Sequence, residues 1–198
     1  MARLAIFIDG GYVDAICRRE VPGTHVDLQK LVNAVHRVVD DSAAEPVDLL
    51  RSFYYSCPPY QGDPPTQDER DRTSAFRSFH TAMERLPRFE VRLGHLQRQG
   101  LRADGSPIFV QKQVDLLLGL DIALLSGKNQ ISHAVLIAGD SDFVPAIKVA
   151  KQEGVSAWLF HGPSRARDDG RSTYSSELWQ AADDRYEMDE ALWQKVRR

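Results

Sequence analysis

The stretch AVLIAGDSDFVP, residues 134–145, gives the clearest indication of the fold. Its first part, Ala134 to Ala138, is short and wholly apolar, which is typical of a strand buried on both faces. The glycine and two aspartates after it indicate a turn, and Phe143 to Gln152 has helical spacing up to a stop at Gly154. A buried strand that runs directly into a helix is the repeating unit of folds with parallel strands.

The same alternation of apolar strands and amphipathic helices continues along the rest of the chain. The predicted strands are Arg3–Ile8, Leu49–Ser56, Phe89–Leu93 and Val155–Phe160, with a hairpin over Gly94–Gln111 that turns at Ala103–Ser106, and the predicted helices begin at Asp27 and cover Thr66–Leu86, Gln113–Leu125, Ser175–Ala182 and Asp189–Val196. Strands that alternate with helices favour a mainly parallel central sheet flanked by helices, which is a three-layer α/β fold.

The helix predicted over Gln113–Leu125 is strongly apolar. We expect Leu116, Leu117, Leu120 and Leu124 to lie inside the core, because buried helix faces are built from such side chains. This expectation matters for the site, since the same helix carries Asp115.

The length and bulk composition bound the architecture. A chain of 198 residues with 42% hydrophobic side chains suits one compact domain with a sizeable core. We place the core of this domain at residues 1–161. We expect residues 162–198 to form a C-terminal loop and short helices that pack on the same domain.

Composition also excludes several classes of protein. No apolar run approaches the roughly 20 residues of a membrane span, and the run Leu4–Ile8 is ended by Asp9, so it does not resemble the core of a signal peptide. We therefore expect a cytoplasmic protein without membrane contact, in which Cys17 and Cys57 are free thiols. The net charge of −3 argues against passive coating of nucleic acid, although acidic metal ligands can hide a local basic patch in the total.

Four aspartates stand where the predicted strands end or the predicted helices begin. Asp9 ends the first strand, Asp140 and Asp142 follow the strand at 134–138, and Asp115 lies near the start of the long helix. In open α/β sheets ligands bind beyond the carboxyl ends of the strands, so these carboxylates are expected to converge at one edge. Carboxylates packed together repel one another, and a divalent cation with a preference for hard oxygen ligands, Mg²⁺ or Mn²⁺, resolves the conflict.

Each of these aspartates also has a purely structural interpretation. Asp9 fits a strand-to-helix turn, Asp140 fits a tight turn, Asp142 fits an N-cap, and Asp115 fits a first-turn charge on the helix dipole. Asp121 lies six residues beyond Asp115, about 240° around an ideal helix, so both are not expected to bind one ion directly.

Three blocks of the sequence, in this order and spacing, resemble the NYN domain, and most closely its LabA-like branch. They are Phe7–Tyr12 (FIDGGY), Lys112–Asp115 (KQVD) with Leu118 and Asp121, and Leu136–Pro145 (LIAGDSDFVP). The resemblance extends from about residue 2 to residue 161. It implies a PIN-like fold with an acidic metal pocket and a Mg²⁺- or Mn²⁺-dependent ribonuclease, more in the manner of an endonuclease than of an exonuclease.

Matched residue by residue, the resemblance assigns roles to particular side chains. Asp9, Asp115, Asp140 and Asp142 take the catalytic and metal-binding positions, and Lys112 takes the lysine before the helix aspartate. Supporting positions beside the metal ligands fall to Asp121 and Ser141. The chain departs from many members at Gly11-Tyr12, where they carry an asparagine, so we expect Tyr12 either to contact substrate or to pack.

The implied partner is RNA, single-stranded or structured, whose phosphates require cations near the acidic pocket. Arg165, Arg167 and Arg171 form a cationic loop after the last predicted core strand, and we expect them to contact substrate. A homodimer is a further possible partner, because the tryptophans Trp158, Trp179 and Trp193 suit either the core or a dimer surface.

Other enzyme classes fit less well. A haloacid-dehalogenase phosphatase needs a second aspartate at position 11, which is Gly11, and a Toprim site needs a glutamate where Asp9 stands. The alternative that stays open belongs to another class: a non-catalytic RNA-binding or regulatory NYN module that keeps the metal pocket. Retention of all four aspartates favours catalysis over this alternative.

Overall fold

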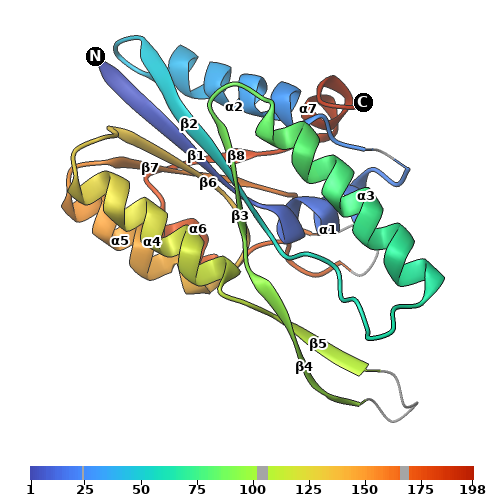
Figure 1. Cartoon of the computed structure of the whole chain (residues 1–198). Helices are drawn as coiled ribbons and strands as arrows, with labels where there is room; N and C mark the ends of the chain where they lie inside the picture. Colours follow the sequence, from blue (N-terminus) through green and yellow to red (C-terminus); the bar gives the residue numbers. More distant parts are fainter. Residues whose placement is uncertain (24, 102–106, 166–169) are drawn as a thin grey trace.

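The computed structural model describes residues 1–23, 25–101, 107–165 and 170–198. Within this part of the chain, six parallel strands form one sheet in the order β3-β2-β1-β6-β7-β8, and β4 pairs with β5 in a separate antiparallel hairpin. Helices cover both faces of the sheet, and the hairpin projects from the body of the molecule (Figure 1). The strands are β1 (Ala2–Asp9), β2 (Val47–Ser56), β3 (Phe89–Leu93), β4 (His95–Leu101), β5 (Pro107–Lys112), β6 (His133–Ile137), β7 (Ser156–His161) and β8 (Asp184–Glu187); the helices are α1 (Gly10–Glu20), α2 (Leu28–Ser42), α3 (Gln67–Glu84), α4 (Val114–Gly127), the short 3₁₀ helix η1 (Ser141–Phe143), α5 (Val144–Gln152), α6 (Ser176–Ala181) and α7 (Glu190–Lys195).

Strand β1 lies in the middle of the sheet and is buried on both faces. All side chains from Leu4 to Ile8 have no exposed surface, and alternate residues point to opposite sides. Ile6 faces one core and Phe7 the other, as the period of two in a strand requires. The continuous apolar run that predicted this strand is therefore explained by its central position.

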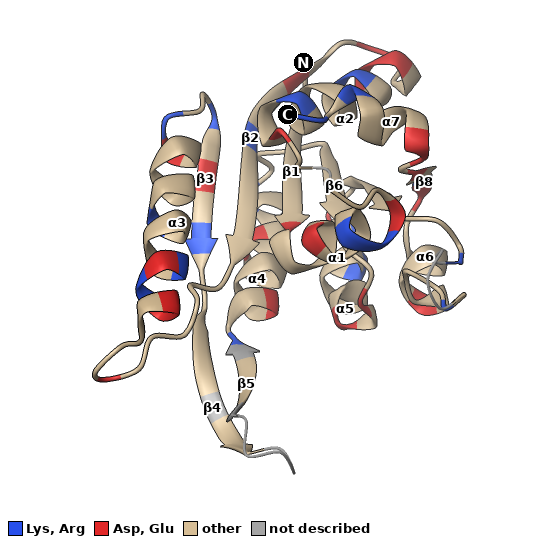
Figure 2. Cartoon of the chain, turned by 90° about the vertical axis from the view of Figure 1, so that its right-hand side faces the viewer, with Lys and Arg blue, Asp and Glu red and all other residues tan. Residues whose placement is uncertain are grey.

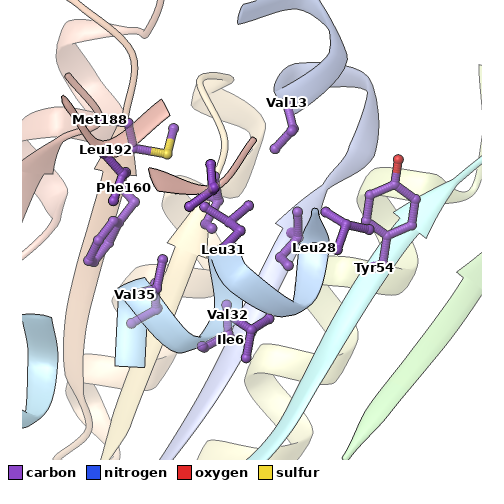
Figure 3. Packing of buried hydrophobic residues seen from close by; sticks show 14 of the residues in the cluster. Ile6, Val13, Leu28, Leu31, Val32, Val35, Tyr54, Phe160, Met188 and Leu192 are labelled. Carbon is purple, nitrogen blue, oxygen red and sulfur yellow. The ribbon is translucent and has the colours of Figure 1, made fainter. Parts of the chain in front are cut away.

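The first core lies between the sheet and helices α1, α2, α3 and α7. Helix α2 begins at the predicted N-cap Asp27, whose carboxylate accepts a hydrogen bond of 3.0 Å from the backbone N–H of Lys30. Its apolar stripe, with Leu31 and Val35 at helical spacing, packs toward Phe160 on β7 (Figure 3). The pattern at positions 28–39 was sufficient to predict this face, because its opposite side is polar.

The second core lies between the sheet and helices α4, α5 and α6, and it corrects one prediction. Leu118 and Ile122 of α4 are fully buried, whereas Leu116, Leu120 and Leu124 are 62%, 48% and 51% exposed. The expectation that these three leucines lie inside the core is wrong, and Leu117 is only partly buried. A helix with leucines around most of its circumference carries little information about which face turns inward.

The strand order positions the functional edge. From β1 the chain builds outward through β2 and β3 on one side, and it then crosses to β6 and builds outward through β7 and β8 on the other. The change of direction falls between β1 and β6. Such a switch point leaves a crevice beyond the carboxyl ends of the two strands, where ligands bind in open α/β sheets.

Most predicted elements are confirmed, and two features were missed. The first is strand β8, which pairs with β7 and extends the sheet past residue 161. The second is helix α1, which follows Asp9 where only a turn was expected. The predicted hairpin is present as β4 and β5, but its predicted turn at 103–106 lies outside the described residues. In the described ranges, no helix combines the length and the apolar character that a membrane crossing needs.

Candidate metal-dependent active site

Asp9 is the last residue of β1 and the N-cap of α1. Its Oδ1 accepts a hydrogen bond of 3.1 Å from the backbone N–H of Tyr12. Burial raises the pKa of the Asp9 carboxyl to about 6, and the charges of Asp115 and Asp140 raise it further, while hydrogen bonds from the backbone of Tyr12 and Gly11 oppose the shift. The strand end therefore holds a largely buried carboxyl group that is costly to ionise.

Asp140 follows β6, the neighbour of β1, and caps the short helix η1. Its Oδ1 accepts hydrogen bonds from the backbone N–H of Asp142, at 3.0 Å, and from the hydroxyl of Ser141, at 3.4 Å. The interpretation of Asp142 as the N-cap is therefore wrong, because Asp140 makes the capping hydrogen bond. Asp142 lies inside η1 with an exposed side chain, one turn before the apolar part of α5.

Asp115 lies in the first turn of α4, at the same edge. The residue before the helix, Gln113, has a φ of 73°, in the left-handed region, which turns the chain sharply from β5 into α4. Burial raises the pKa of the Asp115 carboxyl, and the charges of Asp140 and Asp142 raise it further. Asp115 therefore interacts electrostatically with Asp140 and Asp142, which follow β6, and also with Asp9 at the end of β1.

The four aspartates share one electrostatic neighbourhood at the switch point. Figure 2 shows acidic segments where α4 and α5 begin, below the carboxyl ends of β1 and β6. Asp9 and Asp140 line one hollow of about 470 Å³, and Asp115 and Asp142 line a second of about 480 Å³. As the side chains stand, no three Asp, Glu, His or Cys residues in the described ranges are grouped closely enough to hold a metal ion. The four carboxylates repel one another electrostatically, but they do not form a closed coordination shell.

This arrangement of acids at the switch point has a counterpart among known families. The family model of the NYN domain matches residues 3–188. The chain belongs to the NYN family. The match extends past residue 161 to include β8, and it does not distinguish the LabA-like branch, which stays a prediction. No curated protein and no solved structure matches the chain.

Family membership places this NYN domain among PIN-like nucleases. The predicted α/β fold with a mainly parallel sheet is confirmed by the structure and by the family match. The residue roles inferred from the resemblance are not tested by the match, so the four aspartates remain candidates on the strength of their placement.

Tyr12, the residue at which this NYN domain departs from many members, is built into the wall of the Asp9 hollow. Its hydroxyl accepts a hydrogen bond of 2.8 Å from the backbone N–H of Gly162, just beyond β7. Burial raises the pKa of the Tyr12 hydroxyl to about 12, so it stays protonated at neutral pH. Tyr12 therefore packs between α1 and the end of β7, while its ring still borders the hollow.

The segment Ser172–Ser175, which we call the wall segment, closes the other side of this hollow, and sequence reasoning did not place it there. The backbone N–H of Ser175 donates a hydrogen bond of 2.7 Å to the carbonyl of Gly139, next to Asp140. Tyr174 lies against His161, with ring centroids 4.2 Å apart. Only the tertiary fold brings this segment to β6, so its polar composition was the sole signal in the sequence. The segment contributes Ser172, Thr173, Tyr174 and Ser175 to the lining of the hollow.

Asp121 lies in a different network, as expected from its position on the helix. Its carboxylate accepts a hydrogen bond of 2.8 Å from the hydroxyl of Tyr55 and pairs with the guanidinium of Arg92 at 3.3 Å. Burial, together with the neighbouring Asp121 charge, strongly raises the pKa of the Tyr55 hydroxyl, which therefore donates. The network ties α4 to the ends of β2 and β3 and so fixes the helix that carries Asp115.

Replacing Tyr55 by phenylalanine is expected to lower the free energy of unfolding by about 2 kcal/mol, because the Asp121 carboxylate loses a buried charge-assisted donor. Urea unfolding of Tyr55→Phe, Asp121→Ala and the double variant measures the effect as a double-mutant cycle. The two single losses should not add. Strict additivity would show that the hydrogen bond contributes nothing.

The candidate cations are placed unevenly around the acids. Lys112 ends β5, three residues before Asp115, and is half-buried. Arg165 lines a separate hollow with Glu20 and Trp193, and Arg171 is exposed just before the wall segment that contains Tyr174. Arg167 lies outside the described residues. Lys112 and Arg171 are thus close in sequence to residues that line the two hollows with the aspartates. Arg165 instead lies beside acidic residues near α7.

Proposed function

We propose that this NYN protein is a divalent-metal-dependent ribonuclease that hydrolyses RNA phosphodiester bonds with Asp9, Asp115, Asp140 and Asp142. The observation that carries the proposal is the convergence of these carboxylates at the switch point of a nuclease-family fold. Burial raises the pKa values of Asp9 and Asp115, and the charges of the neighbouring aspartates raise them further, which supports the proposal. Repulsion between carboxylates destabilises the fold and brings no benefit to acids with a purely structural role. Carboxylates that bind one metal ion must lie close together, so their repulsion is an unavoidable cost of such a site.

The donor set fits Mg²⁺ or Mn²⁺ in its chemistry. Carboxylate oxygens are the hard ligands that these ions take, and an ion of charge +2 would offset the repulsion that burial intensifies. Asp9 and Asp140 are held by their capping hydrogen bonds, whereas Asp115 and Asp142 stand on the surface of α4 and η1. Asp115 and Asp142 would supply further carboxylate ligands to an ion held by Asp9 and Asp140.

When bound, such an ion supplies an activated water molecule and neutralises charge on the scissile phosphate. The protein's own residues then have positioning tasks. Lys112 and Arg171, which are close in sequence to residues that line the two hollows, would contact phosphates without selecting a sequence. Tyr174, whose ring borders the hollow, offers a surface on which an unpaired base can stack, and Tyr12 fixes the opposite wall.

An endonuclease fits this site better than an exonuclease. Asp140 and Asp142 are exposed at an open edge of the sheet, and the flanking hollows are shallow depressions of the surface. A continuous RNA strand can cross such an edge without threading an end. Single-stranded RNA and the loops of structured RNA are the expected substrates, because their phosphates and bases are both accessible.

The deciding experiment incubates the purified protein with labelled single-stranded RNA and an RNA hairpin, with Mg²⁺, Mn²⁺ or chelator. We expect cleavage with metal only, and a loss of at least about 100-fold in Asp140→Asn, the size of effect produced by removing one group that acts at the reacting atoms. Asp41→Asn, an exposed aspartate at the far end of α2, is the matched control and should cleave normally. Circular RNA separates endonuclease from exonuclease action.

The nuclease proposal would be wrong if the protein bound RNA without metal and cleaved no substrate above the level of Asp140→Asn. That result would instead identify the non-catalytic RNA-binding module.

A further inference from the structure

A cavity outside the acidic hollows lies between α1 and α3, beside the end of β2. Its volume of about 340 Å³ is at the small end of the range that is usual for ligand pockets, about 300 to 1,000 Å³. Helices α1 and α3 lie on the same face of the sheet (Figure 1). Among the described residues, none that lines this cavity also lines either acidic hollow. We call it the α3 pocket, and its lining includes Val13, Asp14, His25, Tyr54, Phe76 and Phe79.

The inner wall of the α3 pocket is apolar. Val13 of α1, Leu28 of α2 and Tyr54 of β2 are almost fully buried and contribute to this wall (Figure 3). Cys17 follows Val13 by one turn, and burial raises the pKa of its thiol to about 11, so the thiol stays neutral. The inner wall therefore carries no charge at neutral pH and suits an uncharged group.

Two aromatic side chains of α3 form the opposite wall. Phe79 meets the ring of Tyr54 edge-on, with centroids 5.7 Å apart, whereas Phe76 is only partly buried. Of the 18 described residues of α3, Met83 alone is buried, so much of the aromatic face of this helix stays available. Aromatic rings with free surface are the usual stacking partners of unpaired bases.

The mouth of the α3 pocket carries the carboxylate of Asp14. This side chain follows Val13 on α1 and keeps exposed surface. Among the described residues, no hydrogen bond or ion pair reaches its oxygens, and Arg18 acts on it through charge alone. Partial burial raises the pKa of the Asp14 carboxyl, and the Arg18 charge opposes this shift. Both carboxylate oxygens are therefore open to donors of a ligand.

The α3 pocket lies next to the proposed catalytic aspartates. It is on the β2 side of α1, whereas the hollow of Asp9 is on the β6 side. Burial raises the pKa of the Tyr54 hydroxyl, and the charges of Asp14 and Asp9 raise it further, so this hydroxyl interacts with both acids. A Cβ added at Gly10 would lie 2.5 Å from the same hydroxyl oxygen. Along α1, Asp9 and Asp14 are about 7 to 8 Å apart, so one RNA strand can reach both sites.

We propose that the α3 pocket holds one base of the RNA substrate and that the Asp14 carboxylate selects guanine. This inference rests on the proposed ribonuclease function, because it names the nucleotide that the site prefers near the scissile bond. The rings of Phe76 and Phe79 contact the face of the base, and its Watson–Crick edge meets Asp14. His25 and Arg198, which also line the pocket, can contact the phosphate of the same nucleotide.

The choice of guanine follows from the donors that the four bases present. Guanine carries two adjacent donors on its Watson–Crick edge, N1–H and the exocyclic amino group, and they match the two oxygens of one carboxylate. Adenine and cytosine place a ring acceptor beside their single amino group, and uracil flanks its N3–H with two carbonyl oxygens. A carboxylate repels these acceptors. It repels a phosphate group as well, so the base and not the backbone is the expected occupant.

Fluorescence anisotropy in chelator tests the proposal, because the proposed cleavage needs metal and the RNA stays intact. Labelled oligouridylates with one central guanosine, inosine, adenosine or cytidine are titrated with the wild type up to about 300 µM. We expect guanosine to bind at least about 5-fold more tightly than adenosine or cytidine, which is the lower end of the discrimination given by one bidentate pair. Inosine lacks the amino group and should lose most of this advantage.

Two substitutions address the pocket in different ways. Asp14→Asn replaces one acceptor by an amide donor and should abolish the preference for guanosine. Ala75→Trp fills the pocket from an exposed position of α3 and should abolish the preference without a change of charge. The matched controls are Asp41→Asn on α2 and Ala82→Trp, which is exposed on α3 outside the pocket, and both should keep the preference.

Equal affinity of the wild type for all four RNAs, or no binding, overturns the proposal. So does a preference for guanosine that survives in Asp14→Asn or in Ala75→Trp. The ribonuclease proposal fails separately: a protein that prefers guanosine in chelator but cleaves no RNA with Mg²⁺ or Mn²⁺ has the base pocket without the chemistry. Metal-dependent cleavage without a guanosine preference in chelator overturns the pocket alone. Circular dichroism spectra that match the wild type ensure that the variants compared are folded.

Discussion

Asp9→Asn should reduce RNA cleavage by at least about 100-fold and, in chelator at pH 7.5, should raise the free energy of unfolding by about 1 to 3 kcal/mol. The two effects have one origin. The Asp9 carboxylate is proposed to hold the metal, and its burial beside Asp115 and Asp140 makes its charge costly when no metal is bound. Asparagine keeps an oxygen that can accept from the backbone N–H of Tyr12, so the cap of α1 survives the change.

The sign of the pH dependence follows from the direction of the shift. The pKa of Asp9 is about 6 in the folded protein and near 4 in the unfolded chain, so the unfolded chain releases this proton first as the pH rises. The contribution of Asp9 to stability is complete below about pH 4 and is lost as the pH rises through about 6. The advantage of Asp9→Asn should therefore be largest at pH 7.5 and should shrink progressively between pH 6 and pH 4.

Urea unfolding in chelator at pH 7.5, 6 and 4.5, beside a cleavage assay with Mn²⁺, measures both effects. Asp27→Asn is the matched control, because Asp27 caps α2 with the same geometry and an oxygen 3.0 Å from the backbone N–H of Lys30. It should change neither stability nor cleavage appreciably. If Asp9→Asn instead destabilised the protein in chelator as Mn²⁺-dependent cleavage persisted, Asp9 would be a structural cap and nothing more.

Gly139→Ala should lower the free energy of unfolding by about 2 to 3 kcal/mol, because the added methyl group has no room. Its Cβ would lie 2.5 Å from the carbonyl oxygen of Thr173 and 2.5 Å from the ring of Tyr12. The first of these atoms is backbone, and the second belongs to a side chain anchored at Gly162. Relief requires the wall segment to move away from β6, which also breaks the hydrogen bond from Ser175 to the Gly139 carbonyl.

The comparison variant for Gly139→Ala is Gly119→Ala, where the added Cβ would make an ordinary contact of 3.7 Å with Ala146. Alanine favours the helix interior over glycine by about 1 kcal/mol, so Gly119→Ala should be neutral or stabilising. Urea midpoints at low protein concentration measure both variants. A loss below about 0.5 kcal/mol for Gly139→Ala would show that the wall segment does not bind β6 as tightly as the contacts indicate.

The sequence predicted those parts of the fold in which the local pattern and the tertiary environment agree. Strands β1, β6 and β7 are continuous apolar runs because they lie in the middle of the sheet, and Asp9 and Asp140 could be placed because a strand end is visible in the sequence. The inward face of α4 could not be predicted, because leucines stand on both of its sides. Its structure shows Leu118 inside and Leu120 outside.

The features that the sequence did not predict depend on distant contacts. Strand β8 reads Asp-Arg-Tyr-Glu, four residues without an apolar run, and it is a strand because β7 offers a free edge. The wall around Tyr174 joins the acidic hollow through Gly139, 35 positions earlier in the chain. The separate network of Asp121 with Arg92 is likewise formed only when β3 and α4 meet.

The capping role of two of the aspartates bears on how this site can diverge. Asp9 begins α1 and Asp140 begins η1, so the same atoms that would serve chemistry also start the polypeptide on its next turn. A related protein that has lost catalysis no longer needs a negative charge at these two positions, but it still needs a hydrogen-bond acceptor there. Its inherited replacements at these two positions should be asparagine, serine or threonine, whereas alanine should be rare, because it forfeits about 1 kcal/mol of helix initiation. Among the described contacts, Asp115 and Asp142 make no capping hydrogen bond, so a wider range of residues should replace them.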